Sequence, residues 1–352
     1  MGNSEPSGPK GLLSWLGGGG EITPNLTVNV APSHPRGLTL DNLVMAASGT
    51  FGYGVEFAGL VDIQRLGAIV CKGTTLRPRE GNPPPRTVET AAGMLNSVGL
   101  QNLGVEAVIE RYAPEWATWA VPVLVNIAGQ SVDDFARLAE LLDGVPGVAG
   151  LEVNISSPNL EGGGAFFGQD ADMSAAVTRA VRGATGLPTV VKLTPNVTDI
   201  QPIALAVEAA GAHALSLVNT FNGLTIDVRR RAPRLGKGAG GLSGPAIKPL
   251  AIALVARVAE VATVPIIGVG GISSGEDAVE FVLAGATAVQ VGTMHFVNPR
   301  ASLDVLEETE AWLRQHRVSS VVDLVGRGHP LPAVRDRVDK RDAVDAVAAG
   351  LR

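Results

Sequence analysis

The sequence contains a single cysteine, Cys71. One cysteine excludes an internal disulfide and a metal cluster held only by cysteine thiolates. We expect Cys71 to be a small buried apolar residue, because a free cysteine usually behaves as one. The histidines are scattered without the spacing of metal ligands, so we expect no protein-bound metal. They are His34, His213, His295, His316 and His329.

Basic residues and long apolar runs are also scarce. The formal net charge is −6, whereas a non-specific nucleic-acid binder is expected to be basic. No run reaches the roughly 18 apolar residues of a membrane span. We therefore expect no nucleic-acid partner, no membrane span and a cytoplasmic location.

Residues 1–22 are interpreted either as a flexible leader or as a small interfacial or partner-docking segment, since residues 11–17 are its only apolar piece.

Short apolar runs alternate with amphipathic stretches along the rest of the chain. The runs are almost continuously apolar, as in strands buried on both faces. They span residues 44–47, 68–71, 121–127, 150–155, 189–193, 214–218, 265–269 and 288–291. Eight parallel strands joined by right-handed crossovers predict a (β/α)8 TIM barrel of the α/β class.

Capping residues mark several of the intervening helices. Ser131 is a predicted N-cap, Thr198 is predicted to begin a helix that Gly211 ends, and Ser274 another that Gly285 ends. We expect one barrel domain at residues 23–329 and a tail at 330–352 with at most a short helix. A doubly wound sheet is the alternative, but residues 48–54 lack the G-x-G-x-x-G pattern that its first turn requires.

Polar residues and glycines lie at, or directly after, the carboxyl ends of the predicted strands. The carboxyl ends of barrel strands meet at one mouth, where barrel active sites are built. Gly270-Gly271 and Gly292-Thr293 follow the seventh and eighth strands, the place where barrels often bind phosphate, although these glycines could also serve only tight turns. In chain order these residues are Ser48, Lys72, Asn126, Asn154, Lys192, Asn219, Gly270-Gly271 and Gly292-Thr293.

The lysines and asparagines of this mouth suggest its ligands. Lys72 and Lys192 could each pair with a carboxylate, hold a phosphate, form a Schiff base, stabilise an anionic flavin or simply extend into water. Several amides suit a planar ring with alternating C=O and N–H groups, whereas a lone asparagine is more often a turn or cap residue. The amides considered are those of Asn96, Asn154, Asn159 and Asn219.

Long motifs along the barrel resemble those of a known family. They are ASGTFGYG (47–54), GNPPPR (81–86), MLNSVGLQN (94–102), VNISSPN (153–159), KLTPNVTDI (192–200), the segment 219–250, GVGGI (268–272) and VGT (291–293). In this order they are similar to class 1 dihydroorotate dehydrogenases, and most similar to the class 1B catalytic subunit. The resemblance spans about residues 38–329.

The resemblance implies an FMN cofactor and dihydroorotate or orotate as ligand. It implies FMN contacts at Ser48, Lys72, Gly73, Asn126, Asn154, Lys192, Val218, Gly244, Gly270, Gly271, Gly292 and Thr293. It implies substrate contacts at Lys72, Asn96, Ser97, Val98, Gly99, Leu100, Asn154, Asn159, Asn219 and Thr220.

The catalytic residues implied are Ser157, Lys72 and Lys192. Ser157 stands where classes 1A and 1B usually carry cysteine. As a hypothesis, Ser157 removes the C5 proton of dihydroorotate, hydride passes from C6 to flavin N5, and Lys192 steadies the reduced flavin. The reaction would supply orotate for pyrimidine biosynthesis.

The resemblance further implies a homodimer core and a second subunit carrying FAD and an iron–sulfur cluster, which passes electrons to NAD+. The serine and the leader leave fumarate, quinone or another acceptor open. Two alternatives remain open. One is a tRNA-dihydrouridine synthase, which would need a basic RNA-binding face and an added helical domain. The other is an inactive flavin-binding partner.

Overall fold

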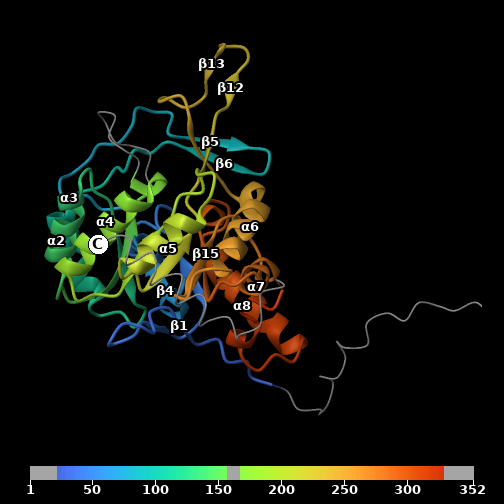
Figure 1. The fold of residues 1–352 in the computed structure, drawn as a ribbon. Helices are drawn as coiled ribbons and strands as arrows, with labels where there is room; N and C mark the ends of the chain where they lie inside the picture. The colour runs from blue at the N-terminus through green and yellow to red at the C-terminus, as the bar shows by residue number, and fades with distance from the viewer. Residues whose placement is uncertain (1–21, 157–166, 329–352) are drawn as a thin grey trace, which may run out of the picture.

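A closed barrel of eight parallel strands forms the centre of the molecule (Figure 1). The computed structural model describes residues 22–156 and 167–328. The barrel strands are β3 (Val44–Ala46), β4 (Ala68–Val70), β7 (Val123–Ile127), β8 (Val148–Asn154), β9 (Thr189–Lys192), β10 (Ala214–Leu217), β15 (Ile266–Val269) and β16 (Ala288–Val291). Each overlaps one predicted run, so the predicted (β/α)8 barrel is confirmed. The strands are almost fully buried, which explains why their sequences are continuously apolar.

Helices follow the strands and cover the outside of the barrel. They are α1 (Val55–Ala58), α2 (Val105–Trp116), α3 (Val132–Leu142), α4 (Ala171–Ala184), α5 (Gln201–Ala209), α6 (Lys248–Ala259), α7 (Gly275–Leu283) and α8 (Ala301–Gln315). Short 3-10 helices lie at η1 (Ile63–Arg65), η2 (Phe167–Gln169), η3 (Pro245–Ile247), η4 (Thr293–Phe296) and η5 (Val321–Leu324).

Two of the three predicted helix starts are confirmed. The Ser131 hydroxyl accepts a hydrogen bond from the Asp134 N–H at the start of α3. Ser274 forms a capping box with Asp277 at the start of α7. The start predicted at Thr198 is wrong, because α5 begins only at Gln201, whose N–H donates to the Asp199 carboxylate. Proline in the first turn of α5 also suits this later start.

A small antiparallel sheet is built from two long insertions. Its order is β11 (Phe221–Gly223), β14 (Gly240–Ser243), β6 (Gly93–Asn96) and β5 (Thr87–Thr90). A hairpin of β12 (Ile226–Asp227) and β13 (Ala232–Pro233) extends beyond it (Figure 1). The insertions follow β4 and β10, so this sheet adds residues to the carboxyl mouth of the barrel. A two-stranded ribbon, β1 (Val28–Asn29) with β2 (Thr39–Leu40), precedes the first barrel strand.

Several sequence predictions fall outside the described residues. They concern the leader before residue 22, the tail at 330–352, and the segment that contains Ser157 and Asn159. The proposed division into leader, barrel and tail therefore stays a prediction. Among the described helices, none combines the length and apolar character needed to cross a membrane.

Candidate active site

A cavity of about 530 Å³ opens at the carboxyl ends of the barrel strands. All the described residues predicted to bind cofactor or substrate line it. On the predicted cofactor side these are Ser48, Lys72, Gly73, Asn126, Asn154, Lys192, Val218, Gly244, Gly270, Gly271, Gly292 and Thr293. On the predicted substrate side they are Asn96, Ser97, Val98, Gly99, Leu100, Asn219 and Thr220. The structure thus brings these residues together, while their individual roles stay predictions.

A buried carboxylate, Glu152, stands behind the cavity wall and was not among the predicted site residues. It lies in β8 and is 0% exposed. The Ser48 hydroxyl and the Asn126 amide donate to its Oε2 at 3.0 and 2.7 Å. The Ser216 hydroxyl and the Gln290 amide donate to its Oε1 at 3.0 and 2.9 Å. The four donors lie in β7, β10 and β16 and just after β3. The carboxylate therefore links four segments of the barrel through hydrogen bonds.

The charge of Glu152 is compensated by Lys192. The Lys192 Nζ lies 3.5 Å from Oε2, and the side chains are 5% and 0% exposed. Burial alone would raise the pKa of Glu152, but the nearby ammonium and the hydrogen bonds from Gln290, Asn126 and Ser216 outweigh it and hold that pKa below its usual value. The sequence did indicate that Glu152 has buried partners, because a carboxylate inside an otherwise apolar strand must be hydrogen-bonded or paired with a charge.

Lys72 projects into the same cavity from the end of β4. Burial lowers the pKa of its ammonium, the Glu56 carboxylate opposes this shift, and the Arg86 guanidinium adds to it. A lysine that is partly desolvated and positively charged suits an anionic group of a ligand. Lys72 therefore fits the predicted contact to a substrate carboxylate.

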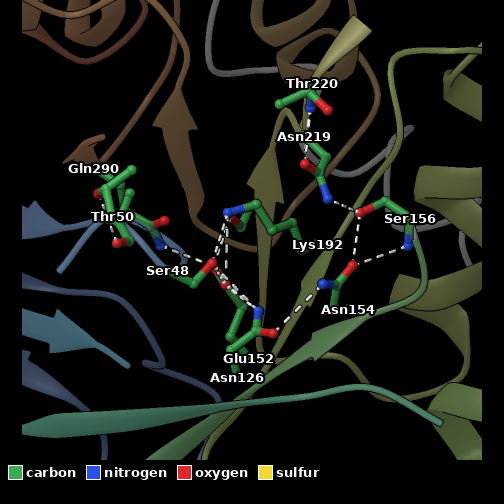
Figure 2. A network of polar contacts seen from close by, with 12 residues as sticks. Ser48, Thr50, Asn126, Glu152, Asn154, Ser156, Lys192, Asn219, Thr220 and Gln290 are labelled. Atoms are coloured by element: carbon green, nitrogen blue, oxygen red, sulfur yellow. Dashed lines mark hydrogen bonds and ion pairs between the residues drawn. The ribbon is translucent and has the colours of Figure 1, made fainter. Parts of the chain in front are cut away.

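Amide and hydroxyl groups form a continuous chain along the cavity wall (Figure 2). The Asn154 amide donates to the Asn126 carbonyl at 3.4 Å. The Asn154 carbonyl accepts from the Ser156 hydroxyl at 2.9 Å, and that hydroxyl accepts from the Asn219 amide at 2.6 Å. Three of the predicted asparagines of the mouth are thus held in fixed orientations, as recognition of a flat polar ring requires.

Backbone N–H groups at the ends of β15 and β16 suit a phosphate. Within the described part of the chain, the N–H groups of Gly271 and Thr293 donate no hydrogen bond. Gly271 has φ +80°, and a Cβ there would come within 2.7 Å of the Lys248 backbone nitrogen. The start of α7 is not open to the same phosphate, because the Asp277 carboxylate already accepts from Ser273 and Ser274. A phosphate would therefore be held by the loop before Ser273 and by the start of η4.

The single cysteine, Cys71, is not expected to take part in catalysis. Cys71 is buried, and burial raises the pKa of its thiol to about 12. The thiol is therefore protonated and unreactive at neutral pH. Across residues 22–156 and 167–328, no group of three histidine, cysteine, aspartate or glutamate side chains is arranged to hold a metal ion.

Comparison with known proteins decides the family. The family model described as dihydroorotate dehydrogenase matches residues 31–313. The chain belongs to the dihydroorotate dehydrogenase family. This membership favours the dehydrogenase interpretation over the tRNA-dihydrouridine synthase.

Curated relatives support the same assignment over almost their whole length. The chain is 54% identical to the "Dihydroorotate dehydrogenase B (NAD(+)), catalytic subunit" of Desulforudis audaxviator, covering 83% of this chain and 95% of the relative. It is 53% identical to the protein of that name from Pelobacter propionicus, covering 87% and 99%. A crystal structure of Eimeria tenella DHODH in complex with ferulenol has a TM-score of 0.73 at 24% identity, covering 87% of this chain and 89% of that one. That last likeness concerns the fold alone.

Proposed function

We propose that the chain oxidises dihydroorotate to orotate in pyrimidine biosynthesis, with FMN as its cofactor. The observation that carries the proposal is the cavity at the barrel mouth, where the amide chain, Lys72, Lys192 and the glycine loops meet. Family membership and curated relatives named as dihydroorotate dehydrogenase catalytic subunits support the same reaction.

The residues present fit FMN. The N–H groups of Gly271 and Thr293 suit its phosphate, and the missing Cβ of Gly271 lets this loop pack closely against the backbone of Lys248. Lys192 supplies a buried positive charge at the cavity wall. When bound, FMN supplies the chemistry of hydride acceptance. The protein's part is to bind, orient and exclude water.

On the substrate side, the amides of Asn154 and Asn219 lie along one wall and Lys72 lies in the same cavity. We assign ring recognition to the amides and carboxylate binding to Lys72. Ser157 is the proposed base for the C5 proton, and it follows Ser156 in the sequence. A serine hydroxyl is a weak base at neutral pH, so nearby positive charge or a relaying water has to assist it.

We also propose that a second subunit carries the electrons onward to NAD+. The relatives are named "catalytic subunit" and "NAD(+)", which supports this route. Phe296 lines the cavity and is 60% exposed, and the adjacent Val297 is 75% exposed. An apolar edge beside the cofactor cavity suits an electron-transfer subunit carrying FAD and an iron–sulfur cluster. The Val297→Ser variant is expected to weaken co-purification of such a subunit while flavin content stays the same, because Val297 is not among the residues that line the cavity.

The proposed function is tested by purifying the chain, recording its visible spectrum and adding dihydroorotate without oxygen. Bleaching of a flavin spectrum is the expected result. A flavin that stays oxidised even with its partner subunit present would refute the substrate, and it would favour an inactive flavin-binding protein. A purified chain that takes up no FMN would refute the cofactor.

A further inference from the structure

We propose that Glu152 is a positioning residue that keeps Lys192 in its charged form through both halves of the reaction. The inference rests on the proposed function only in taking FMN as the cofactor. Without Glu152, reduction of the bound flavin would be coupled to an additional proton, taken up at the Lys192 Nζ. The charge of Glu152 therefore determines how many protons are taken up when the bound flavin accepts two electrons.

The two oxygens of Glu152 face different surroundings. Oε2 meets Ser48, Asn126 and Lys192, all of which line the cavity. Oε1 meets Ser216 and Gln290, which lie in the barrel interior and are at most 1% exposed. The carboxylate thus connects the cavity wall to a buried layer of the core.

The charge of this carboxylate matters because the pair is almost completely buried. A buried ammonium is costly unless an opposite charge lies nearby. The Lys192 Nζ also donates to the Ser48 hydroxyl at 3.3 Å, and that hydroxyl donates to Glu152. Lys192 is therefore held by one carboxylate, directly and through Ser48, so that a neutral substitute for Glu152 leaves the ammonium without a counterion.

Other titratable groups around the pair cannot replace Glu152. The β-strands that pack against β8 and β9 contribute the uncharged Asn126 and Ser216, and β16 contributes Gln290. Cys71 in the neighbouring β4–β7 region stays protonated, since burial raises its pKa to about 12. The remaining described charges of the cavity are those of Lys72 and Lys237, and both are positive. The positive charges of Lys72 and Lys237 make the protonated form of Lys192 less favourable.

The Glu152→Gln variant removes the charge and retains the shape. Its amide oxygen can accept from Ser48 and Asn126 as the carboxylate does. Its amide nitrogen replaces the Oε1 to which Gln290 and Ser216 donate. Once the Gln290 amide turns over, this nitrogen can donate to the Gln290 Oε1, which is buried and has no partner within the described structure, and the Ser216 hydroxyl can accept from it. We therefore expect this variant to fold and to bind FMN.

The test is the midpoint potential of the bound flavin between pH 6 and 9, measured by reductive titration without substrate. In the wild type, two electrons enter with one proton, because Lys192 is already charged. Each pH unit is a tenfold change in proton activity, so the potential should fall by about 30 mV per pH unit. In Glu152→Gln, a second proton is taken up at Lys192, and the slope should double to about 60 mV per pH unit.

Two variants separate charge from packing. Glu152→Asp retains the negative charge in a shorter side chain, and its slope should stay near the wild-type value. Ser216→Ala removes a hydrogen bond to the same carboxylate but no charge, and its slope should also stay near that value. A merely structural role for Glu152 predicts no change of slope in any of the three variants, and that outcome overturns the proposal.

The wild type alone provides a second test, should Glu152→Gln retain no flavin. A wild-type slope of about 60 mV per pH unit across this range would mean that Lys192 gains its proton only on reduction, which overturns the proposal. Failure of the proposed function has a different signature, because a chain that binds no FMN yields no potential at all.

Discussion

The ammonium of Lys192 lies 3.5 Å from the carboxylate of Glu152, and both side chains are buried in the barrel. A second ion pair, Arg65 with Glu307, is closer at 2.8 Å, but its side chains are 44% and 40% exposed. Burial, rather than distance, sets the consequence of breaking each pair. Removing one partner of a buried pair leaves an uncompensated charge, whereas an exposed charge is solvated by water.

We therefore expect Lys192→Met to lower the free energy of unfolding by about 3–5 kcal/mol and to weaken FMN binding. Arg65→Met is the matched control, with an expected loss of about 0–1 kcal/mol and unchanged FMN binding. Urea unfolding gives the stabilities, and fluorescence titration gives the FMN affinity. Equal losses in the two variants, or full FMN affinity in Lys192→Met, would contradict the role given to this pair.

The proposed base, Ser157, is tested by two substitutions. Ser157→Ala should retain FMN and slow the bleaching of the flavin by dihydroorotate by roughly 10²–10⁴-fold, the usual contribution of a positioned base. Ser157→Cys should retain most of the rate, because the resemblance to class 1 enzymes implies cysteine at this position. Stopped-flow absorbance under anaerobic conditions measures both rates. Unchanged bleaching in Ser157→Ala would remove Ser157 as the base.

The phosphate contact proposed for Gly271 leads to a prediction about this glycine. Gly271 has φ +80°, and a Cβ would lie 2.7 Å from the Lys248 backbone nitrogen. Gly271→Ala should therefore reduce FMN affinity at least tenfold and lower the free energy of unfolding by about 1–2 kcal/mol.

Gly183 provides the control, since it lies within α4 and a Cβ added there would meet nothing within 4 Å. Gly183→Ala should raise stability by about 0.5–1 kcal/mol, because alanine favours helix over glycine, and should leave FMN affinity unchanged. The prediction is wrong if both alanine variants bind FMN as the wild type does.

The sequence predicted the barrel and its mouth well for a physical reason. Strands buried on both faces must be apolar throughout, so each run, such as 189–193, could be recognised locally. Residues at the strand ends then converge through the geometry of the barrel alone, which brought Ser48, Asn126 and Lys192 together.

The remaining features depend on partners far away in the sequence. β14 is the glycine-rich segment Gly240–Ser243, which has no strand-like alternation and pairs with β6 from a different insertion. Glu152 was within a predicted strand, but its hydrogen-bond partners come from β7, β10, β16 and the end of β3. Their meeting follows from barrel closure rather than from local pattern, so the role of Glu152 could be inferred only from the structure.

A buried histidine in η4 makes stability sensitive to acid. His295 lies in η4, is 3% exposed, and its ring nitrogens contact the hydroxyls of Ser302 at 2.8 Å and Thr50 at 3.3 Å. Burial lowers the pKa of His295 from 6.5 to about 4, although a hydrogen bond to the Gly292 backbone partly opposes the shift. His295 is therefore neutral in the folded protein at neutral pH.

The sign of the pH effect follows from this lowered pKa. Between about pH 6.5 and 4, the unfolded chain binds a proton at this histidine and the folded chain does not, so stability falls as the pH falls. The expected loss of unfolding free energy from His295 alone is about 2 kcal/mol on going from pH 7 to pH 5. His213, whose pKa burial also lowers to about 4, adds to the loss in the same window.

Urea unfolding at pH 7 and pH 5 measures this loss in the wild type and in two variants. His295→Gln should remove part of the pH-dependent loss, because glutamine does not titrate and the contribution of His213 remains. His213→Gln should remove the other part, because burial lowers the pKa of His213 to about 4 as well. A wild-type stability that is equal at the two pH values, or a His295→Gln variant with the full wild-type loss, would show that His295 does not stay neutral in the folded barrel. In that case η4 would carry a positive charge two residues after Thr293, whose N–H is proposed to bind the phosphate, and FMN affinity should rise as the pH falls.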